Sequence, residues 1–170
     1  MKVLVLGGAR SGKSRYAEQL ARGRGRSLRY IATGEAKDVE MARRIHHHQQ
    51  QRASDWRVHE EALQLGSALA ECDAADSCIL VDCLTLWLSN CLAERCWPEQ
   101  RELFLQTLPT MAADVILVSN EVGSGVVPLG ELSREFVDAS GWLHQELTQH
   151  CDSVTLVVAG LPLYLKGKAP

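Results

Sequence analysis

The sequence lacks any long hydrophobic run. Among its 170 residues, no apolar stretch approaches the ~18 residues that are needed to span a bilayer. The only apolar stretch near the N-terminus, Val3 to Leu6, is too short for a signal peptide and has no cleavage-site pattern behind it. We therefore expect a cytoplasmic protein without a membrane span.

The cysteines lack the spacings of a metal site. They form no CxxC pair, and no histidine stands at a zinc-ligand spacing from them. Disulfide frameworks are typical of secreted chains, so we expect reduced and mostly buried thiols. The six cysteines are Cys72, Cys78, Cys83, Cys91, Cys96 and Cys151.

Aromatic residues are scarce, at 5% of the chain. The basic residues lack the regular interleaving with aromatics that base stacking requires, which argues against a nucleic-acid partner. Charge is nevertheless uneven: residues 1–57 hold 13 Lys or Arg against 5 acids, and the remainder holds 5 against 16. We interpret the first third as suited to a small phosphorylated ligand. A solvated basic face is the alternative for individual arginines.

No internal repeat, low-complexity tract or linker interrupts the chain, so we expect a single domain over residues 1–170. Short apolar runs alternate with longer segments of helical pattern, which predicts a mostly parallel sheet flanked by helices. The runs are continuous, as in strands buried on both faces. The expected strands are 3–6, 28–32, 78–81, 115–118 and 154–159, and the expected helices are 13–23, 38–52, 60–72, 85–95, 98–108 and 132–150.

The first apolar run is followed by GGARSGKS, which fits the phosphate-loop pattern GxxxxGK[ST]. Glycines at these positions let backbone N–H groups surround phosphates at a helix N-terminus. Lys13 would neutralise the β and γ phosphates, and Ser14 would bind Mg²⁺. A glycine-rich turn without a ligand is the alternative. The predicted nucleotide-binding residues of this loop are Gly7, Gly8, Ala9, Arg10, Ser11, Gly12, Lys13 and Ser14.

Asp82 ends the apolar run 78–81, where P-loop proteins place a carboxylate that binds Mg²⁺ directly or through water. Capping of the following helix is the alternative role for this side chain. Together, the loop and the carboxylate predict an α/β fold of the P-loop NTPase type. We expect a mostly parallel central sheet flanked by helices, in a RecA-like three-layer sandwich. The irregular segment 120–130 follows a strand, so we also expect this loop to serve function.

Three consecutive histidines occupy positions 46–48 of the expected helix 38–52. Successive helical residues point about 100° apart, so one histidine can face a site while its neighbours face solvent or core. Met41 and Ile45 mark the buried side, which leaves His47 beside Arg43 to face a phosphate. A solvated run of histidines is the alternative.

Six segments together carry a resemblance to one enzyme family. The segments are GGARSGKSRYAE (7–18), YIATG (30–34), ARRIHHH (42–48), LVDCLTLWLSN (80–90), VSNEVGSGVVP (118–128) and LVVAGLPLYLK (156–166). With them the chain resembles, over nearly its whole length, the bifunctional adenosylcobinamide kinase and adenosylcobinamide-phosphate guanylyltransferase of cobalamin biosynthesis.

The resemblance implies two reactions. In the first, ATP or GTP phosphorylates the aminopropanol hydroxyl of adenosylcobinamide with the help of Lys13, Asp82 and Mg²⁺. In the second, His47 attacks the α-phosphorus of GTP, and the resulting phosphoramidate passes GMP to adenosylcobinamide phosphate. The resemblance also implies a homotrimer. The further nucleotide contacts that it implies come from Thr33, Gly34, Glu35, Arg52 and Glu60.

Two other functions fit parts of the sequence. A monofunctional small-molecule kinase would use the phosphate loop and Asp82 and leave His47 without a role. A nucleotide switch that signals through ordered loops fits less well, because the NKxD-type guanine-reading motif is missing. The corresponding strand is followed by Asn120, Glu121, Val122 and Gly123 instead.

Overall fold

The computed structural model describes residues 1–24, 26–35 and 55–168. Seven strands in this part form one sheet, in the order β3-β2-β4-β5-β1-β6-β7. All neighbouring strands run parallel except β6 and β7, which are antiparallel. The predicted mostly parallel sheet is therefore confirmed. The strands are β1 Lys2–Gly7, β2 Ser27–Ala32, β3 Arg57–Glu60, β4 Ser77–Asp82, β5 Asp114–Asn120, β6 Ser153–Val158 and β7 Leu161–Lys166.

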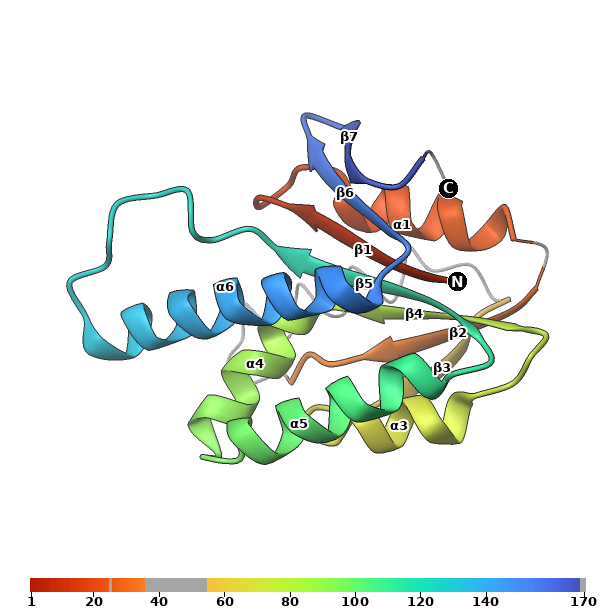
Figure 1. Ribbon diagram of the computed structural model, residues 1–170, viewed down its shortest axis with the longest axis horizontal. Helices are drawn as coiled ribbons and strands as arrows, with labels where there is room; N and C mark the ends of the chain where they lie inside the picture. Colours follow the sequence, from red (N-terminus) through yellow and green to blue (C-terminus); the bar gives the residue numbers. More distant parts are fainter. Residues whose placement is uncertain (25, 36–54, 169–170) are drawn as a thin grey trace.

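Helices cover both faces of the sheet, which gives three layers (Figure 1). Helix α1 packs on one face, and α3, α4, α5 and α6 pack on the other. Strand β1 illustrates the pattern, because Val3 and Val5 point into the α1 layer while Leu4 and Leu6 point into the opposite layer. The helices are α1 Lys13–Arg22, α3 Leu65–Cys72, α4 Leu84–Ala93, α5 Trp97–Thr107 and α6 Glu131–His150, with a 3-10 turn at Leu108–Thr110.

The predicted helix 60–72 is wrong in its first part. Residues 57–60 form strand β3, which pairs in parallel with β2, and helix α3 begins only at Leu65. Three of the four residues of β3 are exposed at the sheet edge, so the apolar signal of a buried strand is missing there. Strand β7 was also not predicted; its run LPLYLK is interrupted by Pro162, which an edge strand tolerates. The expected helix 38–52 lies outside the described residues.

The other predicted elements agree with the structure to within about two residues, which is the usual uncertainty of element ends. All six cysteines are described and are free thiols, and five of them are buried. None of the described helices is both long enough and apolar enough to cross a membrane.

Candidate active site

The connection from β1 to α1 has the curled backbone of a phosphate loop. Arg10 and Gly12 adopt positive φ angles of 56° and 93°, and the N–H of Ser11 donates to the Gly8 carbonyl at 3.3 Å. Helix α1 then begins without a side-chain cap and without an acidic residue in its first turn. Its first N–H groups therefore remain available for an anion, and the helix dipole favours negative charge there.

Both glycines of the GxxxxGK pattern are required by their surroundings. A Cβ atom on Gly7 would lie 2.4 Å from Ser11 Oγ and 2.7 Å from the Val157 carbonyl oxygen. Gly12 combines its positive φ with a close approach to Gly160, whose Cα would lie 3.2 Å from an added Cβ. Gly8, in contrast, has no atom within 4 Å of such a Cβ.

The turn between β6 and β7 supports the phosphate loop. Ala159 and Gly160 both have positive φ, 51° and 80°, as two-residue hairpin turns with the right twist require. The Gly160 N–H donates to the Ser11 carbonyl at 2.7 Å. Sequence reasoning missed this support, although two small residues between two apolar runs were its signal.

Lys13 and Asp82 both lie at the carboxyl ends of the parallel strands: Lys13 follows β1, and Asp82 ends β4. Lys13 Nζ donates to the Gly8 carbonyl at 3.2 Å. Burial raises the pKa of the Cys83 thiol, the Asp82 carboxylate raises it further, and the Lys13 charge lowers it. Strand β1, which leads to Lys13, and strand β4, which ends at Asp82, both pair with β5. Ser14, in the first turn of α1, is half-buried.

Asp82 stands at the carboxyl end of β4 and does not cap the helix that follows. The N-cap of α4 is Cys83, without a side-chain cap hydrogen bond. Asp82 Oδ2 instead accepts a hydrogen bond from the Tyr30 hydroxyl at 3.2 Å. The capping alternative for this carboxylate therefore finds no support.

Thr33 holds the backbone next to Asp82. Its buried hydroxyl donates to the Cys83 carbonyl at 2.7 Å and accepts from the Cys83 N–H at 2.9 Å. The Thr33 carbonyl in turn accepts from Asn90 Nδ2 at 2.9 Å. In this structure the Thr33 hydroxyl thus serves the protein itself, and the predicted contact of Thr33 with a nucleotide stays a prediction. Tyr30 and Asn90 were missed as supporting residues.

The other predicted nucleotide contacts lie towards the opposite end of the sheet. Gly34 is half-buried and Glu35 is exposed, and both follow β2. Glu60 ends β3, paired with Ala32. Four strand spacings separate β3 from β1, which amounts to about 19 Å at ~4.8 Å each. His47 and Arg52 lie outside the described residues.

Strand β5 connects the phosphate-loop side of the site with the Asp82 side, because it lies between β1 and β4. Asn120 at its end donates to Thr85 Oγ1 at 3.2 Å, and Thr85 Oγ1 lies 3.0 Å from Cys83 Sγ. One residue further, the Glu121 N–H donates to the Gly7 carbonyl at 3.0 Å. The loop after β5 is thereby fixed to both the phosphate loop and the Asp82 side.

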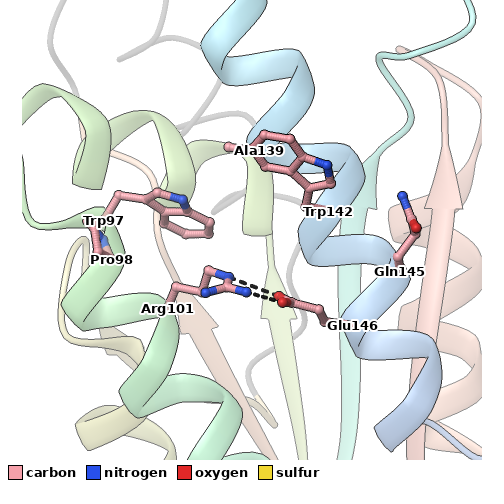
Figure 2. A pocket seen from close by; sticks show the side chains of 7 residues that line it. All are labelled: Trp97, Pro98, Arg101, Ala139, Trp142, Gln145 and Glu146. Carbon is pink, nitrogen blue, oxygen red and sulfur yellow. Dashed lines mark hydrogen bonds and ion pairs between the residues drawn. The ribbon is translucent and has the colours of Figure 1, made fainter.

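A pocket of about 460 Å³ lies elsewhere, between α5 and α6. Figure 2 shows the Trp97 and Trp142 rings at its sides and the Arg101–Glu146 ion pair below them. None of the predicted site residues lines it. The lining residues are Trp97, Pro98, Arg101, Ala139, Trp142, Gln145 and Glu146.

The oxygen donors at the site suit Mg²⁺. Among the described residues there is no group of three or more His, Cys, Asp or Glu that could hold a metal alone. Mg²⁺ does not need such a group, since it keeps several waters and binds one or two protein oxygens together with substrate phosphates. The Ser14 hydroxyl and the Asp82 carboxylate are donors of this kind.

A model of the family described as "Cobinamide kinase / cobinamide phosphate guanyltransferase" matches residues 3–165. The chain belongs to this family. It is 52% identical over 171 residues to the "Bifunctional adenosylcobalamin biosynthesis protein CobP" of Pseudomonas aeruginosa, with 99% of each chain covered. It is 37% identical over 182 residues to the corresponding CobU of Salmonella typhimurium, with 98% of this chain and 100% of that protein covered. The chain is therefore an enzyme, a transferase of this family.

A solved structure supports the fold at low sequence identity. The flagellar accessory protein FlaH from Methanocaldococcus jannaschii matches with a TM-score of 0.52 and 12% identity, over 98% of this chain and 78% of that chain. At this identity the likeness concerns the fold alone. The predicted RecA-like P-loop NTPase fold is confirmed.

Proposed function

We propose that this enzyme phosphorylates adenosylcobinamide with ATP or GTP and then transfers GMP from GTP to the product through a covalent His47 intermediate. The observation that carries the kinase step is the uncapped N-terminus of α1 behind a loop shaped by Gly7 and Gly12. Backbone N–H groups and Lys13 would there stabilise the charge of the transferred phosphoryl group.

Mg²⁺ would bind through Ser14 and Asp82 and, when bound, neutralise charge on the β and γ phosphates. The chain's own contribution is to fix these ligands. Ser14 sits on the first turn of a rigid helix, and Asp82 receives a hydrogen bond from Tyr30 and adjoins backbone held by Thr33.

The guanylyl transfer would use the carboxyl ends of β2 and β3, on the same side of the sheet as the phosphate loop. Gly34, Glu35 and Glu60 follow the two strands at that end. Glu60 on β3 is four strand spacings from β1, and Gly34 and Glu35 after β2 are three, which amounts to about 19 Å and about 14 Å. These separations support a nucleotide position distinct from the phosphate loop. In the proposed step the His47 imidazole attacks the α-phosphorus of GTP, pyrophosphate leaves, and the acceptor phosphate later displaces the histidine.

We further propose a cytoplasmic homotrimer. The support is the edge strand β7, where Leu161, Leu163 and Leu165 are 72%, 56% and 56% exposed. A long apolar edge strand is a surface on which chains associate. Light scattering should give three times the mass of one chain. A mass equal to one chain would refute the trimer and leave the two reactions open.

Incubation with α-labelled GTP and Mg²⁺ tests the covalent step. We expect an acid-labile, base-stable label on the protein, as a phosphoramidate gives. The His47→Ala variant should lose the label and keep the kinase step, while His46→Ala and His48→Ala should keep both. A label that depends on His46 instead would move the nucleophile by one residue. A label that survives in all three variants would place the nucleophile outside these histidines, and wild type without any label would favour a monofunctional kinase.

A further inference from the structure

The loop after β5 presents a cluster of large apolar side chains to water. Val126, Val127, Leu129 and Leu132 are 95%, 73%, 99% and 79% exposed, and we refer to them as the apolar loop surface. Figure 1 shows this loop extending beyond the carboxyl ends of the strands before the chain enters α6. Apolar residues exposed singly are ordinary, but such a cluster marks a surface that binds something.

The base of this loop is fixed at the phosphate site. The Glu121 backbone N–H donates to the Gly7 carbonyl on one side, and the Asn120 side-chain amide donates to the Thr85 hydroxyl on the other. The chain that carries the apolar loop surface therefore leaves the site between the phosphate-loop strand and the Asp82 strand. A ligand on this surface needs a flexible arm to reach a nucleotide phosphate in the phosphate loop.

The loop offers side chains rather than backbone to its ligand. Arg134 Nη1 donates to the carbonyls of Pro128 and Leu129 at 3.2 and 2.5 Å, so these backbone acceptors are already used. This differs from β7, whose outer edge has the geometry for pairing with another strand. The apolar loop surface is suited to a ligand with an apolar rim, and the outer edge of β7 is suited to pairing with a strand of another protein chain.

The first two turns of α6, which directly follow the loop, carry mainly negative charge. Glu131, Glu135 and Asp138 are exposed on the first two turns of α6, whereas the cation on the same turns, Arg134, is directed to loop carbonyls. An apolar ligand with positive charge is therefore favoured over an anionic one.

We propose that the apolar loop surface binds the corrin ring of the cobinamide substrate, an inference that rests on the proposed function. The ring carries methyl and methylene groups at its rim. Its cobalt(III), bound by a monoanionic corrin and a carbanionic alkyl group, leaves a net positive charge. Held on this surface, the substrate can bring its hydroxyl to the ~3–3.5 Å from the phosphorus that in-line attack needs.

Equilibrium dialysis of adenosylcobinamide tests the surface directly. In the Val126→Ser/Val127→Ser/Leu129→Ser variant we expect the Kd for adenosylcobinamide to rise at least tenfold, because three apolar contacts are lost. The GMP adduct and the melting temperature should stay unchanged, since the adduct needs no corrinoid and the side chains are exposed. Val58→Ser, at a 48% exposed position on β3, is the matched control and should bind normally.

A second variant, Glu131→Gln/Glu135→Gln, tests the charge. It should raise the Kd several-fold at low salt and less at high salt, because screening weakens exposed charges. If the triple variant binds adenosylcobinamide as tightly as wild type does, and wild type also phosphorylates it, the loop assignment is wrong. The proposed function then still stands. A triple variant with altered mass in light scattering would mean that a second copy covers the loop, which also overturns the loop assignment. Wild type that binds no adenosylcobinamide overturns both.

Discussion

The phosphate loop and the Asp82 loop share one edge of the sheet but are held in place differently. The phosphate loop depends on missing side chains, because Gly7 and Gly12 let the backbone approach Ser11, Val157 and Gly160. The Asp82 loop depends on side chains that are present elsewhere, chiefly the Thr33 hydroxyl and the Tyr30 hydroxyl, about 50 residues away in the chain. One half of the site is thus a local motif, and the other half forms only in the folded sheet.

The largest effect should come from the charge of the phosphate loop. We expect Lys13→Ala to slow the kinase step by about 10³-fold or more, because a preorganised charge on the transferred phosphoryl group disappears. The GMP adduct, if it forms at the carboxyl ends of β2 and β3, should decline much less. The measurement is single-turnover kinetics of both steps. Arg15→Ala, at an exposed neighbouring position, is the control, and a normal kinase rate in Lys13→Ala would remove this lysine from the site.

Next in size should be the steric test of the loop. Gly7→Ala places a methyl group 2.4 Å from Ser11 Oγ and 2.7 Å from a backbone oxygen, which should cost about 1–3 kcal/mol of unfolding free energy and weaken nucleotide binding. Gly8→Ala meets no atom within 4 Å and should change stability by less than about 0.5 kcal/mol. Denaturant unfolding of the pair measures the difference. Equal stability of the two variants would contradict the tight packing of Gly7.

The fold was predictable wherever burial left a local pattern. Strands at the centre of the sheet, such as β4 and β5, are buried on both faces and therefore appear as continuous apolar runs. Strand β3 is exposed at the edge and has the sequence RVHE, which carries no such pattern. Its place is decided by pairing with β2, a long-range contact that single-sequence patterns do not contain.

The site divides in the same way. The phosphate loop and the position of Asp82 followed from the sequence, because a strand end and a helix start are local features. The hydrogen bonds of Thr33 to Cys83 and of Gly160 to Ser11 join segments about 50 and 150 residues apart, and no local spacing encodes them. The contact of Thr33 with a nucleotide stays a prediction, and the bond of its hydroxyl to the Cys83 backbone is an additional role that the sequence did not indicate.

The smallest effect, and the sharpest test of the comparison, concerns Thr33. Thr33→Val keeps the shape of the side chain but removes the hydroxyl, so the buried N–H of Cys83 loses its partner, while the Cys83 carbonyl keeps only the Trp87 N–H at 3.3 Å. An unsatisfied buried group costs about 1–3 kcal/mol, and we expect a loss of about 2 kcal/mol in unfolding free energy. Because the altered backbone adjoins Asp82, the Mg²⁺ concentration for half-maximal kinase activity should also rise several-fold.

Thr110→Val is the matched control for this variant. Its exposed hydroxyl also donates to a backbone carbonyl, that of Thr107 at 2.8 Å, but water can replace that bond, so its stability should stay within about 0.5 kcal/mol of wild type. If the two valine variants were equally stable, the Asp82 loop would not depend on Thr33. If Thr33→Val lost stability but kept its Mg²⁺ dependence, the hydroxyl would support the fold without positioning the carboxylate. Only a loss of stability together with a higher Mg²⁺ requirement would show that Thr33 helps to position the Asp82 carboxylate.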